Sequence, residues 1–308
     1  MRIKVIVNPA ARKGRSGRNW PARAAKLEAA AGAFDVAFTE APRHATELAR
    51  QAVADGFDTM VAVGGDGTVN EVLNGLLDGD AMANPDLTLC PLPAGTANEL
   101  ARQLGILEGD LAIDAIAGGT RSHIDMGRVR CTGFDGQPRT HHVFISGSFG
   151  SAAEISYRTN NSKVIKKLGA EFSYYIVTLL VMIGYKPTPL TVRVDDHFEA
   201  TIPVHSGLGC NTETAGGGMK IAPGAKIDDG LLDLVLFKDV GAADLLLKPP
   251  SWLFEGRHIE HPEVQLIQGR HIEIDGPSEI MVDADGETVG RLPMVLDVLP
   301  GTLPVKRL

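Results

Sequence analysis

The sequence predicts an α/β domain with a parallel sheet, followed by an antiparallel β-sandwich domain. Strands and helices alternate as far as about residue 120, and strands outnumber helices after that point. At 308 residues, the chain is longer than one ordinary hydrophobic core supports, so two domains are expected. The apolar fraction of 44% and the charged fraction of 22% are typical of a globular protein.

The N-terminal domain is expected to comprise residues 1–122, with residues 300–308 returning to it. Its first strand is predicted at Ile3–Val7. Helices are predicted from about Trp20 and at His44–Ala54, where apolar residues recur on one face. Short apolar runs predict the other strands, at residues 34–38, 60–63 and 87–92. This alternation indicates a parallel sheet covered by helices.

The second domain is expected to comprise residues 123–299, with a helical insert at about residues 152–184. Apolar and polar residues alternate in Leu190–Val194 and His271–Ile274, as in half-buried strands. Further strands are predicted at residues 123–130, 142–146, 200–204, 231–237, 264–267, 280–282 and 295–299. Many short strands favour a sandwich. The cleft between the domains is the default position for a ligand.

The stretch at residues 59–77 is the most informative part of the sequence. An apolar run leads into Gly64-Gly65-Asp66-Gly67, and a helical pattern follows. Thr68 and Glu71 have the spacing of a capping box, which predicts the helix start. Glycines before a helix N-terminus favour phosphate binding, because backbone N–H groups can approach an anion and the helix dipole attracts it. Asp66 cannot bind a phosphate by itself, so it is expected to act through Mg²⁺ or to orient the loop.

A second copy of this pattern follows the next predicted strand. Gly95-Thr96-Ala97-Asn98-Glu99 repeats the Gly-Thr-x-Asn-Glu spacing of residues 67–71. Two such helix starts after neighbouring strands can converge on one polyphosphate at the carboxyl ends of the strands. The alternative is two ordinary glycine-rich turns. The candidate phosphate contacts are Gly64, Gly65, Gly67, Thr68, Gly95, Thr96 and Asn98.

Charge and cysteine content restrict the class of protein. A net charge of −8, without a basic stripe carrying aromatic residues, argues against nucleic-acid binding. Cys90, Cys131 and Cys210 are far apart and suit a reducing compartment. The first residues are too short in apolar length for a signal peptide, and no apolar stretch reaches the ~20 residues of a membrane-spanning helix. A cytoplasmic protein is expected, with peripheral contact to the inner membrane face.

Several motifs resemble the catalytic domain of diacylglycerol kinases, in particular the soluble bacterial lipid kinases related to sphingosine and ceramide kinases. They occur in the family's order over nearly the whole chain, at residues 8–9, 64–72, 93–98, 216–223, 229–233 and 285–287. The first glycine motif alone is shared with NAD kinases, and phosphofructokinases carry a related one. The resemblance implies an α/β nucleotide-binding domain and a β-sandwich domain, in an NAD-kinase-like arrangement with ATP and Mg²⁺ between them.

The resemblance also implies roles for individual residues. The nucleotide would be held by Asn8, Thr39, Gly65, Asp66, Gly67, Thr68 and Thr96. Lys13 would reach a phosphate from the basic segment at residues 10–18, which by itself is either a solvated loop or a phosphate clamp. The family's loop reads Asn-Pro-x-x-Gly, whereas this chain has Arg12 at the position of that glycine.

Phosphoryl transfer requires a bound triphosphate, a divalent cation and an acceptor for the hydroxyl proton. Asp285 matches the family's proposed base, with Glu287 assisting and Asp66 acting through the metal. Asp285-Gly286 is also a strong signal for a hairpin turn, and a hairpin tip can carry a catalytic carboxylate. Asp228 and Asp229 have the oxygen chemistry of Mg²⁺ ligands. The resemblance implies a structural Mg²⁺ on Asp229 and the carbonyl of Leu231, with Asp228 as a further ligand; the alternative is a surface turn.

The lipid side of the reaction is less clearly encoded. The helical insert is apolar enough to line a lipid slot. Arg158, Lys163, Lys166 and Lys167 form a basic segment that is expected to make transient contact with an anionic membrane surface, each contributing ~1 kcal/mol. The alternative is a solvated face beside a buried helix. Long β edges favour a homodimer.

These features predict an ATP- and Mg²⁺-dependent kinase that phosphorylates the hydroxyl of diacylglycerol or a related lipid, such as ceramide, a sphingoid base or phosphatidylglycerol. One alternative is a kinase of NAD or another small molecule, and a second is a non-catalytic nucleotide-binding sensor. The motifs from Gly216 to Glu287 favour the lipid group. The sequence does not indicate a hydrolase, because it lacks a Gly-x-Ser-x-Gly motif.

Overall fold

The structure is a computed structural model that describes residues 1–161, 177, 180–181, 184–240, 248 and 251–308. The chain divides into two compact units, residues 1–126 with 299–308 and residues 127–298. It passes from the first unit to the second within strand β7 (Thr120–Thr132) and returns within strand β17 (Glu287–Arg307). The domain boundaries expected from the sequence, 122/123 and 299/300, lie close to these crossings.

The first unit is built on a parallel sheet with the strand order β6-β3-β1-β2. Its strands are β1 (Ile3–Val7), β2 (Asp35–Phe38), β3 (Thr59–Gly64) and β6 (Thr88–Pro93). Each pairing is parallel, which confirms the predicted sheet. Every residue of β3 and β6 is buried, as expected for central strands covered on both faces. The end of β17 extends the sheet, with Val305 paired to Leu89.

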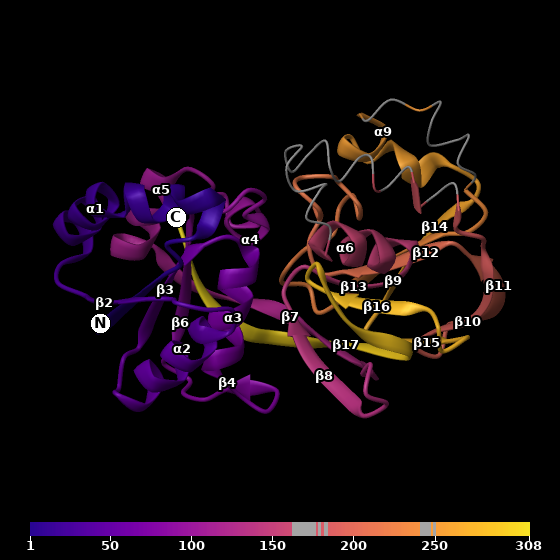
Figure 1. Cartoon of the computed structure of the whole chain (residues 1–308), viewed down its shortest axis with the longest axis horizontal. Helices are drawn as coiled ribbons and strands as arrows, with labels where there is room; N and C mark the ends of the chain where they lie inside the picture. The colour runs from indigo at the N-terminus through magenta and orange to yellow at the C-terminus, as the bar shows by residue number, and fades with distance from the viewer. Residues whose placement is uncertain (162–176, 178–179, 182–183, 241–247, 249–250) are drawn as a thin grey trace. The chain divides into compact units, whose positions relative to one another are not determined.

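Helices flank this sheet on two sides (Figure 1). They are α1 (Ala11–Ala31), α2 (His44–Ala54), α3 (Asp66–Leu76), α4 (Glu99–Gln103) and α5 (Gly109–Gly118). Helix α1 packs on α5, and α2 packs on α3. A small hairpin of β4 (Leu77–Asp78) and β5 (Ala81–Met82) follows α3. Helix α2 has the bounds that its apolar periodicity predicts. Helix α1 begins before Trp20, although Arg12, Lys13 and Gly14 within its bounds have non-helical backbone angles.

The second unit consists mainly of antiparallel strands. Besides its parts of β7 and β17, the strands are β8 (Pro138–Val143), β9 (Ser146–Gly150), β10 (Thr188–Val194), β11 (Phe198–Val204), β12 (Ser206–Cys210), β13 (Leu232–Phe237), β14 (Val264–Gly269), β15 (His271–Asp275) and β16 (Met281–Ala284). Strand β17 pairs with both β16 and β15. One apolar core includes the fully buried Phe149, Val192, Leu234 and Leu296. The antiparallel prediction is confirmed.

One strand prediction in this unit was wrong, and one strand was missed. The strand predicted at residues 142–146 falls instead across the end of β8 and the start of β9. Strand β12 had no predicted counterpart, because glycine is depleted in strands and hides the pattern. The helical insert begins with α6 (Ser151–Asn161), and Lys163, Lys166 and Lys167 lie outside the described residues. The short helices α9 (Ser251–Phe254) and η2 (Arg257–Glu260) precede β14.

The three cysteines form no disulfide bond. Cys90, Cys131 and Cys210 are free and buried, and burial raises the pKa of the Cys90 thiol to about 12. None of the helices in the described parts of the chain combines the length and the apolar character that crossing a bilayer requires.

Candidate nucleotide-binding site

The turn after β3 places the start of α3 earlier than the sequence predicts. Gly65 is the N-cap residue, with extended backbone angles, and the helix begins at Asp66. Thr68 therefore lies within the first turn, where its hydroxyl accepts a hydrogen bond from Asn8 Nδ2 at 3.0 Å. The Glu71 carboxylate accepts the N–H of Ala45 at the start of α2, at 3.2 Å. The predicted capping box is thus wrong, because glycine occupies the cap and both side chains bind other elements.

The glycine turns after β3 and β6 lie against each other. These strands are neighbours, and the N–H of Ala94 donates to the carbonyl of Gly64 at 2.8 Å. A Cβ atom on Gly95 would lie 2.2 Å from the Cα of Gly65, and one on Gly64 would lie 2.3 Å from Thr68 Oγ1. Only glycine fits at these two positions. The structure therefore brings together the two motifs that the sequence predicts to converge.

Asn98 shapes the second turn with its side chain. It is left-handed, with φ of 51°, and its Oδ1 accepts the N–H of Gly95 at 2.8 Å while its Nδ2 donates to the Gly95 carbonyl at 3.0 Å. Helix α4 begins at Glu99 rather than at Thr96, because Asn98 occupies the N-cap position. Thr96 is left exposed at the tip of the turn.

Asp66 connects the beginnings of the two helices. Its Oδ1 accepts the N–H of Glu99, the first residue of α4, at 2.7 Å. Burial raises the pKa of the Asp66 carboxyl and the Glu99 carboxylate adds to this, whereas the N–H groups of Glu99 and Asn98 oppose it. The Asp66 carboxylate thus joins the two loops, which supports the expectation that Asp66 orients the turn.

Asn8 and Thr39 follow β1 and β2, so they lie at the same carboxyl edge of the sheet as the glycine turns. The N–H of Asn8 donates to Val63 and that of Thr39 donates to Val7, both at 2.9 Å. Asn8 also binds its own turn, since its Oδ1 accepts the N–H of Ala10 at 3.1 Å. This edge is where parallel α/β sheets bind ligands.

The segment after Asn8 contains three consecutive left-handed residues. The angle φ is 49° at Arg12, 56° at Lys13 and 82° at Gly14. Arg12 thus adopts the conformation that glycine favours, at a cost of ~1–2 kcal/mol for an L-residue. The loop keeps a glycine-like backbone although Arg12 replaces the glycine of the resembled family. Lys13 is exposed, and no carboxylate among the described residues pairs with it.

In the second unit, Asp285 occupies a hairpin between β16 and β17. Positive φ values of 50° at Asp285 and 86° at Gly286 confirm the predicted hairpin turn. The Asp285 carboxylate accepts three backbone N–H groups, from Phe144 at 3.0 Å, Ile145 at 2.9 Å and Ser146 at 3.0 Å. These bonds hold the connection between β8 and β9, and they explain why residues 142–146 do not form one strand.

Asp283 is a residue of the same hairpin that the sequence reasoning missed. Its side chain is buried, and its Oδ1 accepts the N–H of Gly286 at 2.9 Å. Burial raises the pKa of the Asp283 carboxyl to about 7, and the carboxylates of Asp285 and Glu287 contribute. The only sequence signal is its position at the end of a buried strand. Glu287, in contrast, is exposed.

Asp228 and Asp229 lie in an exposed turn before β13. The Asp229 Oδ1 accepts the N–H of Leu231 at 3.1 Å, and Gly230 has φ of 73°, so the turn has its own local support. Asp233 follows it, buried, with a pKa raised by burial and by the Asp229 carboxylate. Two carboxylates and the Leu231 carbonyl are donors that suit Mg²⁺, with water completing the shell. No cluster of three or more His, Cys, Asp or Glu suited to a metal occurs among the described residues.

Paired glycine turns on a parallel α/β unit, joined to an antiparallel β unit, define a class of two-domain proteins. Two family models match the chain: the diacylglycerol kinase catalytic domain over residues 2–129, and the YegS C-terminal NAD kinase beta sandwich-like domain over residues 146–307. The chain belongs to the diacylglycerol kinase catalytic-domain family with a YegS-like C-terminal domain. The resemblance noted in the sequence is thus confirmed.

Individual relatives agree with this assignment. A diacylglycerol kinase of Staphylococcus epidermidis (strain ATCC 35984) is 30% identical over 297 residues, covering 95% of this chain and 87% of that protein. The crystal structure of a candidate diacylglycerol kinase from Bacillus anthracis str. Sterne has a TM-score of 0.79 at 24% identity, covering 100% and 95% of the two chains. Yeast NADH kinase has a TM-score of 0.54 at 12% identity, covering 100% and 84%. These two structures bear on the fold alone, and they confirm an α/β region followed by a β-sandwich-like domain.

Proposed function

We propose that this protein is an ATP-dependent lipid kinase whose acceptor is the hydroxyl of diacylglycerol or a related lipid. The observation that carries the proposal is the contact between the Gly65 and Gly95 turns, with Asp66 bonded to the start of α4. Because the N–H groups of Gly95 and Glu99 are already bonded to Asn98 and Asp66, the polyphosphate would meet the two turns at exposed Gly67 and Thr96. Membership in the diacylglycerol kinase family supports the choice of a lipid acceptor.

The residues of the first unit bind and orient the nucleotide in this proposal. Exposed Gly67 and Thr96 leave both turns open to phosphate oxygens, and Lys13 supplies a positive charge. Asn8 holds the Thr68 hydroxyl at 3.0 Å, so it positions a residue of the α3 turn. Gly64 and Gly95 allow the turns to close, and Asn98 fixes the second one. A nucleotide held at this edge would have its terminal phosphate fixed for attack.

The second unit supplies the proton acceptor and the structural metal site. Asp285 is the proposed base, with Glu287 assisting, and the three N–H bonds fix the orientation of the Asp285 carboxylate. Asp228, Asp229 and the Leu231 carbonyl would hold a structural Mg²⁺. Bound at the triphosphate, Mg²⁺ would spread the negative charge of the transferring phosphoryl group, and Asp66 would act through it. A lipid acceptor also implies that the protein makes transient contact with an anionic membrane surface from the cytoplasm. We further propose that the protein forms a homodimer.

The proposal is tested by incubating the protein with γ-labelled ATP, Mg²⁺ and a total lipid extract. We expect label in one organic-phase product, identified by mass spectrometry as a phosphorylated lipid. A parallel reaction contains NAD and no lipid. Label in NAD and none in any lipid would replace the proposal with a small-molecule kinase. ATP binding by calorimetry, without transfer to any lipid or to NAD, would favour a nucleotide sensor.

A further inference from the structure

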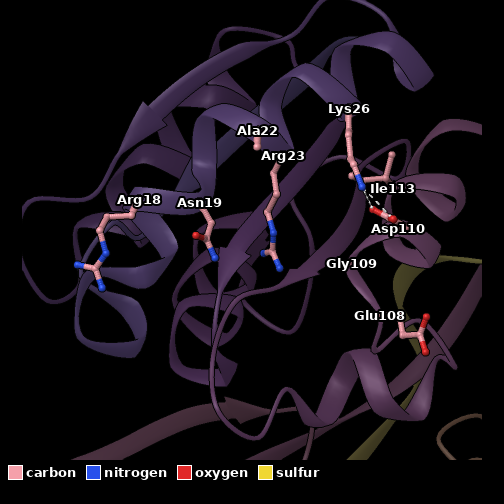
Figure 2. Close-up of a pocket in the computed structure, with 9 residues that line it drawn as sticks. All are labelled: Arg18, Asn19, Ala22, Arg23, Lys26, Glu108, Gly109, Asp110 and Ile113. Atoms are coloured by element: carbon pink, nitrogen blue, oxygen red, sulfur yellow. Dashed lines mark hydrogen bonds and ion pairs between the residues drawn. The ribbon is translucent and has the colours of Figure 1, made fainter.

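The first unit contains a cavity of about 410 Å³ between α1 and the beginning of α5 (Figure 2). It is lined by Arg18, Asn19, Ala22, Arg23, Lys26, Glu108, Gly109, Asp110 and Ile113. Arg18 is the last residue of the basic segment at residues 10–18, and the other lining residues are not among the candidate nucleotide contacts. The volume lies within the range of ~300–1,000 Å³ that is typical of small-molecule sites.

Arg23 is the most constrained cation of the cavity. Its Nη1 donates to the carbonyl of Pro93 at 2.8 Å, and its side chain is half-buried. Burial lowers the pKa of the Arg23 guanidinium and the charge of Arg12 adds to this, whereas Asp110 opposes it. Gly109 lets this group approach α5, because a Cβ atom there would lie 3.3 Å from Arg23 Nη2. The protein thus holds a guanidinium, partly desolvated, against a helix beginning.

The beginning of α5 adds positive potential to the same cavity. The helix has 10 residues, and its N-cap residue, Glu108, makes no capping hydrogen bond with its side chain. The first N–H groups of a helix carry a partial positive charge that favours anions. Asp110 lies in the first turn of this helix, and its charge also acts on the Arg23 guanidinium.

Part of the charge in the cavity is already balanced. Lys26 Nζ binds both oxygens of Asp110, at 2.8 and 2.9 Å, so this pair is neutral (Figure 2). The side chains of Arg18 and Asn19 make no hydrogen bond or ion pair with the residues that the structure describes, and both line the cavity together with Arg23. Two guanidinium groups and a helix start therefore line the cavity with one further carboxylate, Glu108, whose side chain points away from both arginines (Figure 2).

We propose that this cavity is a second anion site, which binds a phosphomonoester through Arg18, Asn19, Arg23 and the beginning of α5. Guanidinium groups bind phosphate oxygens in pairs, and an amide and helix N–H groups can complete the shell. The volume leaves room for a small organic group on the phosphate. A free phosphomonoester and the headgroup of a phosphomonoester lipid share this chemistry. The inference depends on the cavity alone and is independent of the proposed kinase activity.

The test measures binding of sn-glycerol 3-phosphate to the full chain by calorimetry at low salt. Arg18→Gln removes an exposed charge and is expected to weaken binding by ~10-fold, the effect of losing a charge-assisted hydrogen bond. Asn19→Asp should weaken it further, because it places a carboxylate in the site. Arg50→Gln, an exposed change on α2, is the matched control and should bind as the wild type does.

A second control separates this cavity from the glycine turns. Gly67→Glu adds a carboxylate at the start of α3, where a Cβ atom has no heavy atom within 4 Å, and binding of sn-glycerol 3-phosphate should be unchanged. The lipid arm compares phosphatidylcholine vesicles with and without phosphatidic acid by sedimentation. Binding only to phosphatidic acid vesicles, lost in Arg18→Gln, would support the site with a lipid headgroup as its ligand. No binding in either arm, equal binding by Arg18→Gln, or loss in Gly67→Glu instead would overturn the proposal.

Discussion

Asp66 and Asp285 sit in glycine-containing turns of different units, and the structure uses their carboxylates differently. Asp66 accepts the N–H of Glu99 at 2.7 Å and so joins two helix beginnings. Asp285 accepts three N–H groups on its two oxygens and so anchors a chain connection. In the first unit, the carboxylate aligns two turns in which Gly67 and Thr96 remain exposed to a ligand. In the hairpin, the Asp285 carboxylate itself accepts the hydrogen bonds that hold the chain. Its removal should therefore lower the free energy of unfolding as well as the turnover.

The largest effect is expected at the contact between the glycine turns. Gly95→Ala would place a Cβ atom 2.2 Å from the Gly65 Cα, and the two glycines follow closely on the paired ends of β3 and β6, at Gly64 and Pro93. We expect a loss of ~3 kcal/mol or more in the free energy of unfolding, the upper end for overpacking, and loss of ATP binding. Urea unfolding and calorimetry measure the two quantities.

Gly67→Ala is the matched control for this prediction. Its added Cβ atom meets no heavy atom within 4 Å, and alanine favours the helix by up to ~1 kcal/mol relative to glycine. Equal unfolding free energies for Gly95→Ala and the wild type would show that the turns are not in rigid contact.

The next effect concerns the hairpin. Asp285→Asn keeps the shape of the side chain but replaces one acceptor oxygen with a donor that faces backbone N–H groups. We expect a loss of ~2–3 kcal/mol in unfolding free energy, as for hydrogen bonds to a charged group. Turnover should fall by orders of magnitude, measured below the melting transition of the variant.

Glu287→Gln provides the comparison within the same hairpin. Glu287 is exposed, so its unfolding free energy should stay within ~0.5 kcal/mol of the wild type. If Asp285→Asn kept normal stability, the three N–H bonds would not matter to the fold. If it kept normal turnover, Asp285 would not be the base.

A smaller effect follows from the buried Asp283. Its pKa of about 7 in the folded state lies above the ~4 of an unfolded chain, so folding favours the protonated form. The folded state therefore loses stability as pH rises from ~4 to ~7, and the loss is complete above that range. Asp283→Asn removes this titration and should stabilise the protein by ~1–3 kcal/mol at pH 8, with little change near pH 4.

Urea unfolding of the wild type and Asp283→Asn across this pH range measures the difference directly. A difference that is constant with pH would mean that Asp283 does not titrate on folding. Asp195→Asn is a useful control, because the Asp195 side chain also accepts backbone N–H groups but lies outside this hairpin.

The smallest effect is expected in the first unit. Thr68→Val keeps the side-chain volume but removes the acceptor of Asn8 Nδ2. One neutral hydrogen bond contributes ~1 kcal/mol, so the unfolding free energy should fall by that amount and ATP affinity should fall modestly. For the unfolding free energy, Thr39→Val is the control at the same sheet edge, since the hydrogen bond of Thr39 to Val7 uses its backbone N–H. Equal losses in the two variants would contradict a specific role for the bond between Asn8 and Thr68.

The parts of the fold that the sequence predicts correctly depend on local pattern. Strands β1, β3 and β6 are continuous apolar runs, and α2 has clear helical periodicity. The convergence of the two glycine motifs also follows from local order, because both come after neighbouring parallel strands.

The predictions that failed depend on contacts distant in sequence. Residues 142–146 look like one strand, but three of their N–H groups bind Asp285 far along the chain. Glu71 looks like a capping-box residue, but its carboxylate binds the start of α2. Arg12 is left-handed at the position where the resembled family has glycine, and the burial of Asp283 depends on tertiary packing.

The most direct test of the nucleotide site is the affinity of Gly67→Glu for Mg·ATP, measured by calorimetry. Gly67 is exposed, a Cβ atom there has space, and a carboxylate in the first turn favours the helix. The variant should therefore fold with at least wild-type stability and lose nearly all ATP binding, because its charge lies where the phosphates are held. Wild-type affinity in a folded Gly67→Glu protein would contradict a polyphosphate site at these turns.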